Sequence, residues 1–572
     1  MRQLIIKIRK TQPFFARNFG NDLSYFHHTC NEPLRALTMG QLLEKTTNKY
    51  PDRPALISRH QKQVLTFQQV LEQADTLAAA FKIIGLQPQD RVGIWAPNMV
   101  EWYVTHIACA RGGFILVNLN PAFQRQEIKN LINTIGIRGI VCAHKFKSQN
   151  YYQHLQDICP ELSKCPPGGL KSPNAPSLKS IIVISEENLQ GTFKYNDLFS
   201  MASTSEINEI GKNQEFIDPG QECHFQTTSG STGNPKVPVQ THFQQFNNSY
   251  FLSKNFGFDK QQQVLCLPLP FFHVFGGVVG LCSALHYGGT IVLPSASFEV
   301  DKTLEALKGN KCTMIYGTPT LYVDLINRLE QTKEKVNVGV AVTGGATTDK
   351  RLFKKMKKIL GVQKIKSVYG LTETTSGIFH SLDDEDELQV LETVGKLAEH
   401  MEAKVVDSEG RIVRRGMSGE LLIRGYATTL GYWQNPEKTN ELFDSDKWLH
   451  TGDEFILYEN GYGKMVGRIS DIIIRGGENI YPKPIEDLLN IHPNILQAQV
   501  VGVPHERLGE EVCAVLRVES NANVTVEDIR SFLKGKIAHF NIPSRVEIVD
   551  EFAKTSIGKV HKRKIIQNIL NQ

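Results

Sequence analysis

Short apolar runs alternate with longer amphipathic stretches over the first two thirds of the chain. The stretch Phe67–Ile84 predicts a helix, because its apolar residues recur every three or four positions and Gly85 follows. The runs Arg91–Trp95 and Thr290–Leu293 have the length and apolar content of buried strands. Strands that alternate with helices in this way predict parallel βα units in a doubly wound sheet.

The pattern changes in the last third of the chain. Beyond about residue 400 the apolar runs become strand-like, and after Arg468 a shorter mixed unit begins, with a helix expected at Val526–His539. A chain of 572 residues is also too long for one hydrophobic core. We therefore expect an α/β protein with a large multi-sheet N-terminal domain at 38–468 and a small α+β C-terminal domain at 469–572.

The N-terminus has a different character. Residues 1–21 contain no Asp or Glu, and they combine basic residues such as Arg2 and Arg9 with a run of Leu and Ile. This composition favours an amphipathic mitochondrial presequence over a secretory signal, and we assign it to residues 1–30. A disordered basic tail on a cytosolic protein is the alternative.

Composition excludes several classes of protein. The chain is 41% hydrophobic and 22% charged with a net charge of +5, and it has no basic stripe interleaved with aromatic residues, so no nucleic-acid partner is expected. The ten cysteines are scattered, which predicts reduced thiols. No apolar run is long enough for a transmembrane segment. Oligomeric state cannot be deduced from these features.

A loop rich in glycine and hydroxyl groups lies near the middle of the chain. Glycine lets backbone N–H groups turn toward an anion, hydroxyls add donors, and lysine adds a positive charge. The candidate phosphate ligands are Thr228, Ser229, Gly230, Ser231, Thr232, Gly233, Asn234, Pro235 and Lys236. A Walker loop would continue with Ser or Thr after its lysine, whereas Val237 and Pro238 follow here, so a magnesium ligand must come from elsewhere. The alternative is a flexible surface turn.

Two further loops follow predicted strands, where parallel sheets bind ligands. In Tyr369-Gly370-Leu371-Thr372-Glu373 the aromatic ring could stack on a purine, Thr372 could bind a phosphate oxygen, and Glu373 could bind magnesium. A capped helix start would explain this pentapeptide equally well. The other loop, Gly344-Gly345-Ala346, would let a flat ring approach the backbone.

Three charged residues complete the candidate site. Asp453 could bind a ribose diol, and Arg468 could bind a second hydroxyl or a phosphate. A salt-bridged turn would explain either residue. Lys559 stands in a short turn near the C-terminus, where a mobile segment could deliver its charge to a phosphate, although such lysines are usually solvated.

Taken in order, these motifs resemble those of the adenylate-forming acyl-CoA synthetases, over roughly residues 38–570. The segments 271–277 (Phe-Phe-His-Val-Phe-Gly-Gly) and 473–482 (Ile-Ile-Arg-Gly-Gly-Glu-Asn-Ile-Tyr-Pro) look most like the medium-chain mitochondrial branch. The resemblance implies ATP, Mg²⁺ and a fatty acid as ligands of the large domain, with coenzyme A as co-substrate. It also implies that the small domain is a mobile lid with a hinge at Asp471.

The resemblance assigns roles to matching positions. Residues 228–236 would cradle the phosphates, while Gly344, Gly345, Ala346 and Tyr369 would frame the adenine. Thr372 would touch the α-phosphate, Glu373 would hold Mg²⁺, and Asp453 and Arg468 would hold the ribose. Lys559 would stabilise charge between the carboxylate and the α-phosphate during adenylation only. His273 would lie near the acyl entrance, and a core histidine is the alternative.

The expected activity is an ATP-dependent ligase that converts medium-chain fatty acids to acyl-CoA in the mitochondrial matrix. One rival is a ligase for an aryl or other small carboxylic acid. Another rival is a non-catalytic nucleotide-binding protein. Such a protein would not need Lys559. Preferred chain length cannot be deduced, because the pocket walls come from residues that are distant in the sequence.

Overall fold

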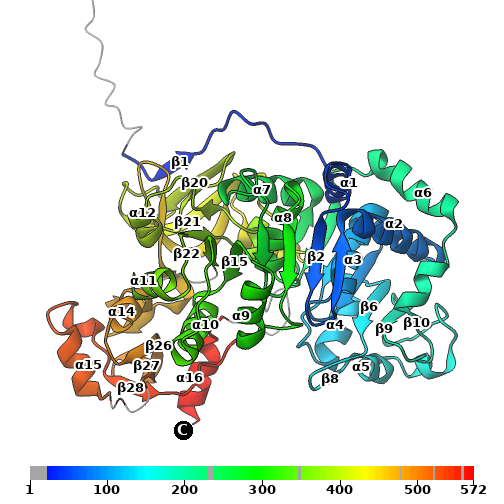
Figure 1. Cartoon of the computed structure of the whole chain (residues 1–572). Helices are drawn as coiled ribbons and strands as arrows, with labels where there is room; N and C mark the ends of the chain where they lie inside the picture. The colour runs from blue at the N-terminus through cyan, green and yellow to red at the C-terminus, as the bar shows by residue number, and fades with distance from the viewer. Residues whose placement is uncertain are drawn as a thin grey trace, which may run out of the picture.

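The computed structural model describes residues 22–227, 236–344, 350–476, 478–519, 522, 524–555 and 559–571. Within these ranges the chain forms two large, mainly parallel sheets with helices over their faces, an antiparallel sheet, and a separate C-terminal α+β unit (Figure 1). The predicted fold class is confirmed. The predicted boundaries at 38, 468 and 469 remain predictions.

The first large sheet has the order β10-β9-β6-β4-β5-β11-β12, and β9, β6, β4, β5 and β11 run parallel. Its strands are β4 (Arg91–Trp95), β5 (Ile115–Asn118), β6 (Gly139–Ala143), β9 (Ser180–Ile184), β10 (Phe193–Lys194), β11 (Glu222–Gln226) and β12 (Val239–Thr241). Its helices are α2 (Phe67–Ile83), α3 (Val100–Gly112), α4 (Arg125–Ile135), α5 (Tyr151–Ile158) and α6 (Thr204–Lys212). The side chains of β5 and β6 are buried throughout, as expected for strands covered on both faces.

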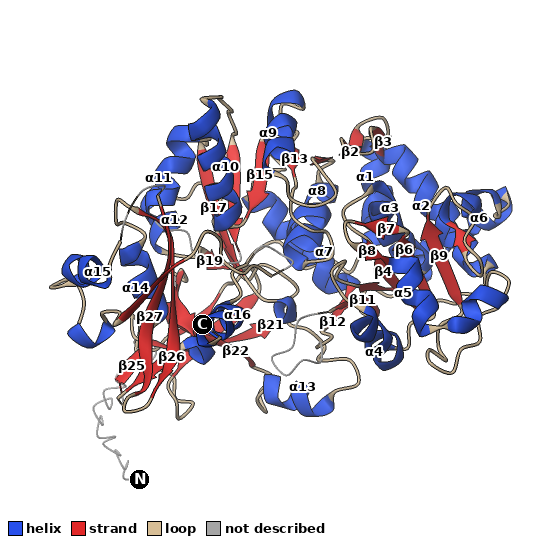
Figure 2. Cartoon of the chain, turned by 90° about the horizontal axis from the view of Figure 1, so that it is seen from below, coloured by secondary structure: helices blue, strands red, loops and turns tan. Residues whose placement is uncertain are grey.

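The second large sheet has the order β19-β18-β17-β16-β15-β13-β14-β2-β3. Its strands are β2 (Pro54–Ser58), β3 (Gln63–Thr66), β13 (Val264–Cys266), β14 (Thr290–Leu293), β15 (Met314–Gly317), β16 (Val340–Gly344), β17 (Lys364–Tyr369), β18 (Phe379–His380) and β19 (Lys396–Leu397). Its helices include α1 (Met39–Lys49), α7 (His242–Asn255), α8 (Ser283–His286), α9 (Val300–Gly309), α10 (Pro319–Thr332), α11 (Lys350–Ile359) and α12 (Glu387–Glu392). Figure 2 shows the two sheets next to one another, with helices over their faces.

The third sheet is antiparallel, in the order β1-β20-β21-β22-β23. Its elements are β1 (Tyr25–His27), β20 (Met401–Val406), β21 (Ser418–Gly425), β22 (Leu449–Leu457) and β23 (Gly463–Arg468), with α13 (Pro436–Leu442) between β21 and β22. The edge strand β1 lies inside the range 1–30 that we assigned to the presequence, whereas residues 1–21 lie outside the described residues. Loss of the whole assigned range would therefore remove one strand of this sheet.

The residues after Arg468 form their own sheet with two hydrophobic cores (Figure 1). This unit contains β24 (Ile473–Arg475), β25 (Glu478–Ile480), β26 (Ile495–His505), β27 (Gly509–Val518), β28 (Arg545–Ile548), α14 (Pro482–Leu489), α15 (Val526–Leu533) and α16 (Lys562–Leu570). The helix expected at Val526–His539 was predicted too long, because α15 ends at Leu533 and Gly535 has a left-handed φ of 76°.

Many other predicted elements agree with the structure. The helix α2 ends one residue before the predicted end, and β4 and β14 have the predicted bounds, Arg91–Trp95 and Thr290–Leu293. Each of the ten cysteines is free of a disulfide bond. Among the described residues no helix is both long and apolar enough to cross a bilayer.

Candidate functional site

The structure brings most of the described candidate residues to one edge of the large sheets. Gly344 ends β16 and Tyr369 ends β17, and Thr372 and Glu373 follow directly, so these residues lie at the carboxyl ends of neighbouring parallel strands. The remaining described candidates are Lys236, Asp453, Arg468 and Lys559. Residues 228–235, together with Gly345 and Ala346, lie outside the described residues.

Asp453 is the buried centre of a polar cluster. The antiparallel register pairs it with Arg468, whose Nε lies 3.2 Å from Asp453 Oδ1. The hydroxyl of Tyr369 donates a hydrogen bond of 2.6 Å to Asp453 Oδ2. Asp453 is only 1% exposed, and burial raises the pKa of its carboxyl group, although Arg468 and Tyr369 oppose this rise.

The Oδ1 atom of Asp453 keeps unused acceptor capacity. Among the described residues it is buried and accepts no hydrogen bond, since Arg468 lies beside it without hydrogen-bond geometry. A buried acceptor without a donor costs free energy unless a ligand or water supplies the donor. A sugar hydroxyl would meet this need.

Lys559 lies beside this cluster, although it belongs to the C-terminal unit. Its backbone N–H donates to Thr555 Oγ1 at 3.2 Å, and its carbonyl accepts from the Thr555 N–H at 2.6 Å. Burial lowers the pKa of the Lys559 ammonium group to about 8; Arg468 adds to this effect and Asp453 opposes it. Lys559 is therefore a partly desolvated cation close to two charged residues of the larger part.

Glu373 is held in a tight turn after β17. Its carboxylate Oε1 accepts a 2.8 Å hydrogen bond from the Tyr432 hydroxyl, and its carbonyl accepts from the Thr429 N–H at 2.8 Å. The turn requires glycine at position 370, because a Cβ there would lie 1.5 Å from the Ser376 carbonyl oxygen. One carboxylate oxygen thus has a partner, and the other can bind a ligand.

Lys236 belongs to the same group of residues, since its Nζ lies over the Tyr432 ring, 5.0 Å from the ring centroid. Tyr432 therefore contacts both the last residue of the phosphate loop and the predicted magnesium ligand. Sequence reasoning missed this tyrosine, because it stands 59 positions from Glu373 and belongs to no recognisable motif.

An amide network, also missed from the sequence, holds the strand that precedes the phosphate loop. Asn118 donates a 3.0 Å hydrogen bond to the side-chain oxygen of Gln226, and Gln226 donates to the Phe272 carbonyl. The hydroxyl of Thr227 donates to the Asn118 carbonyl at 2.7 Å. This network joins β5, β11 and the segment that carries His273.

His273 is half-buried next to the Phe272 carbonyl. Its Nδ1 accepts a 3.1 Å hydrogen bond from the Phe275 N–H, which leaves the proton of the neutral ring on Nε2. Burial, with a smaller effect from Lys559, lowers the pKa of His273 to about 3, so the ring is neutral near pH 7. Its assignment to the acyl entrance remains a prediction.

Gly344 lies close to the neighbouring strand β17. A Cβ at this position would lie 2.7 Å from Val368 Cγ1 and 2.9 Å from the Val368 carbonyl oxygen. Any larger residue would force β16 and β17 apart at their carboxyl ends.

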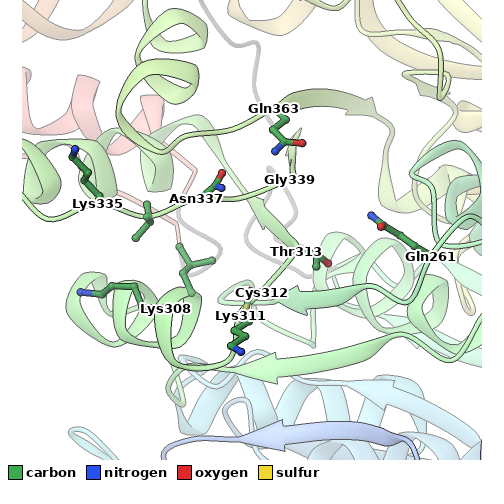
Figure 3. A pocket seen from close by; sticks show the side chains of 11 residues that line it. Gln261, Lys308, Lys311, Cys312, Thr313, Lys335, Asn337, Gly339 and Gln363 are labelled. Carbon is green, nitrogen blue, oxygen red and sulfur yellow. The ribbon is translucent and has the colours of Figure 1, made fainter.

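A depression of about 510 Å³ elsewhere on the surface is distinct from this site (Figure 3). It is lined by residues that precede strands, among them Thr313 before β15, Gly339 before β16 and Gln363 before β17. It therefore lies at the amino ends of the strands, whereas Tyr369 and Glu373 lie at or beyond their carboxyl ends. The depression contributes nothing to the candidate site.

The charges of the site suit a polyanion. Lys236, Arg468 and Lys559 are cationic, and Glu373 adds one carboxylate. The described residues contain no group of three or more His, Cys, Asp or Glu side chains that could hold a metal alone. Mg²⁺ commonly needs only one or two protein carboxylates when phosphates and water complete its shell, so Glu373 fits such an ion.

Comparison with known families gives two matches. The model of the AMP-binding enzyme family matches residues 43–433, and the model of the AMP-binding enzyme C-terminal domain matches residues 484–559. The first match alone covers more than half of the chain.

Several named relatives are similar to this chain over most of their length. The mitochondrial medium-chain acyl-CoA ligase ACSF2 of Danio rerio is 38% identical, over 95% of this chain and 90% of its own. The human ACSF2 is 37% identical, over 95% of this chain and 89% of its own. YngI of Bacillus subtilis is 32% identical, over 92% of this chain and 96% of its own.

Solved structures share the fold. ATP-bound MatB from Rhodopseudomonas palustris superposes with a TM-score of 0.78 at 25% identity, over 93% of this chain and 99% of its own. The anthranilate CoA ligase AuaEII in complex with anthranoyl-AMP superposes with a TM-score of 0.81 at 22% identity, over 95% of this chain and 99% of its own.

Proposed function

Because the chain belongs to the AMP-binding enzyme family, we propose that it is an ATP-dependent ligase that joins a medium-chain fatty acid to coenzyme A through an acyl-adenylate. The observation that carries the proposal is the position of Lys559 beside Asp453 and Arg468. A protein that only bound a nucleotide would not need this lysine.

The ribose would bind near Tyr369, which contacts Asp453, and the phosphates near Glu373, where Tyr432 and Lys236 lie. Asp453 Oδ1, which lacks a donor among the described residues, would accept from a ribose hydroxyl, and Arg468 would hold the second one. Lys236 and residues 228–235 would bind the phosphates, with Thr372 at the α-phosphate. The adenine would lie between the backbone at 344–346 and Tyr369.

Glu373 would hold Mg²⁺, with Tyr432 fixing the carboxylate through its hydroxyl. When bound, the ion would neutralise charge on the β- and γ-phosphates. In the first half-reaction an oxygen of the fatty carboxylate attacks the α-phosphorus, the bond to pyrophosphate breaks, and acyl-adenylate forms. Lys559 would stabilise the negative charge on the oxygens around that phosphorus.

In the second half-reaction the sulfur of coenzyme A attacks the acyl carbon. The bond from that carbon to AMP breaks, the thiol proton leaves to solvent, and acyl-CoA and AMP are released. We infer that Lys559 acts in adenylation only and that the C-terminal unit, residues 469–572, turns about Asp471 between the two half-reactions.

The substrate class follows from the relatives, two of which are named medium-chain acyl-CoA ligases. An aryl acid is the second candidate substrate, because AuaEII, which has a similar fold, is an anthranilate CoA ligase. We also propose mitochondrial targeting by an N-terminal segment, on the basis of the acid-free, basic residues 1–21 and the names of the ACSF2 relatives.

The experiment that tests the function measures AMP and thioester formation with Mg-ATP, coenzyme A and a panel of acids from butyrate to palmitate, plus benzoate and anthranilate. We expect thioester formation to peak at intermediate chain length. The variant Lys559→Ala should lose adenylation by about a hundredfold or more and still bind ATP. If ATP binds but no acid yields AMP, the protein is a non-catalytic nucleotide binder.

A further inference from the structure

Asp324, on helix α10, contacts two cations of the C-terminal unit. Its Oδ2 lies 3.2 Å from Lys554 Nζ, and its Oδ1 lies 3.8 Å from Arg517 Nη1. Its side chain is 20% exposed, so water screens these contacts only in part.

Lys554 lies at the base of the loop that carries Lys559. It forms an antiparallel bridge with Val560, and the Thr555 N–H and the Lys559 carbonyl are hydrogen-bonded inside that bridge. The His561 N–H donates to the Ala553 carbonyl on the outer side. Because these backbone hydrogen bonds join the two strands at the base of the loop, a displacement of Lys554 would also displace Lys559.

Arg517 holds the segment that leads into the same loop. Its Nε donates a 3.1 Å hydrogen bond to the carbonyl of Asp550, four residues before Lys554. One carboxylate thus contacts both the base of the loop and the arginine that fixes its approach. Asp324 itself is not among the residues expected to touch the nucleotide or the acid.

Another contact between the two parts lies elsewhere. Arg351, on α11, donates hydrogen bonds of 2.9 Å to the carbonyls of His492 and Ile495, which flank the start of β26. These contacts hold the C-terminal unit but do not touch the segment 550–561. Asp324 therefore contacts the base of this loop, in addition to the contact that Lys559 itself makes with the charges of Asp453 and Arg468.

We propose that Asp324 is a positioning residue that holds Lys559 in the site for adenylation by binding Lys554 and Arg517. The inference rests on the proposed function. A rotation that withdraws Lys559 for the second half-reaction must also break the Asp324 contacts, because Lys554 moves with Lys559. Asp324 therefore stabilises the adenylating arrangement relative to the thioester-forming one.

The test compares the two half-reactions in Asp324→Asn, Asp324→Ala and Lys554→Ala. We expect the rate of acyl-adenylate formation to fall by about threefold to tenfold, as for one or two partly exposed ion pairs. Thioester formation from supplied acyl-adenylate and coenzyme A should stay unchanged or rise. The double variant Asp324→Ala/Lys554→Ala should lose little more than Asp324→Ala, since that substitution already removes the contact with Lys554.

The matched control is Glu330→Gln on the same helix. Glu330 Oε2 binds Lys355 Nζ at 3.2 Å, and both residues belong to the larger part of the chain. This variant should leave both half-reactions unchanged. Equal loss in both half-reactions for Asp324→Ala, or no loss in adenylation, would overturn the proposal.

A second readout does not depend on activity. Lys559 can be labelled by an amine-reactive reagent and quantified by mass spectrometry in the full-length protein without substrates. Release of the loop in Asp324→Ala should increase this labelling relative to the wild type and Glu330→Gln, and unchanged labelling would contradict the proposal. If the wild type adenylates no acid, the proposed function fails, while the labelling still decides whether Asp324 holds Lys559.

Discussion

At the scale of single residues, Lys559 has a charge that changes within the range of ordinary assays. Its pKa is lowered to about 8, so the ammonium form dominates below that pH and is lost as the pH rises through it. We expect kcat/KM for adenylation, which reports the free enzyme, to fall above a pH of about 8. Bound phosphates favour the charged form of the Lys559 amine. We therefore expect kcat to fall at a higher pH than kcat/KM does.

The variant Lys559→Arg checks this assignment, since a guanidinium keeps its charge across the whole range. Whatever activity it retains should no longer decline near pH 8. A decline of the same shape in this variant would show that another group titrates.

Tyr432 offers a second test at this scale. In Tyr432→Phe the ring under Lys236 remains, but Glu373 loses its hydroxyl donor. A hydrogen bond to a charged group contributes about 1.5–3 kcal/mol, and solvent reduces this figure at a site that is not fully buried. We expect about a threefold to tenfold loss in kcat/KM and a higher Mg²⁺ concentration at half-maximal rate.

The control for this variant is Tyr152→Phe, which removes an exposed hydroxyl that donates to the Gln190 carbonyl far along the chain from Glu373. It should leave the Mg²⁺ dependence unchanged. If Tyr432→Phe also leaves it unchanged, Tyr432 does not support the metal ligand.

At the scale of elements, the turn after β17 depends on a residue without a side chain. In Gly370→Ala the new methyl group would overlap the Ser376 carbonyl, so the turn that carries Thr372 and Glu373 must move. We expect a loss of about 1–3 kcal/mol in the free energy of unfolding, measured with urea, together with loss of adenylation. Gly211→Ala, in helix α6 with only the Arg111 side chain nearby, should be neutral or stabilising by about 0.5–1 kcal/mol.

At the scale of the whole molecule, the third sheet indicates where an N-terminal segment can be removed. A protein that begins at Asp22 keeps β1, whereas one that begins at residue 31 loses it. Phe26 of β1 packs on the buried cluster around Phe455, and the Tyr25 hydroxyl donates to Glu402. We expect removal of residues 22–30 to lower stability by about 1–3 kcal/mol relative to the Asp22 form, measured by urea denaturation.

The same strand bears on processing in cells. If residues before Asp22 act as a presequence, mass spectrometry of the mature N-terminus should find cleavage at or before that position. Cleavage after residue 27 would mean that β1 is not part of the mature protein.

Sequence alone determined those features that depend on neighbouring residues. Helical spacing and a following glycine predicted α2, and runs of apolar residues predicted β4 and β14, because both signals lie within one element. The order of the glycine-hydroxyl loop, Glu373, Asp453 and Lys559 was sufficient to recognise the family, since chemistry restricts the residue types at these positions. The helix expected to reach His539 shows the limit of the method, because apolar spacing continued beyond the glycine that ends the helix.

The tertiary structure alone decided which of these residues meet. Tyr432 binds Glu373 across 59 positions, Asn118 binds Gln226 across 108, and Lys554 binds Asp324 across 230. No local pattern encodes such pairs, because each depends on how the sheets and the C-terminal unit pack together. The chemical groups of the site could thus be predicted from the sequence, whereas the contacts that orient them could be found only in the folded molecule.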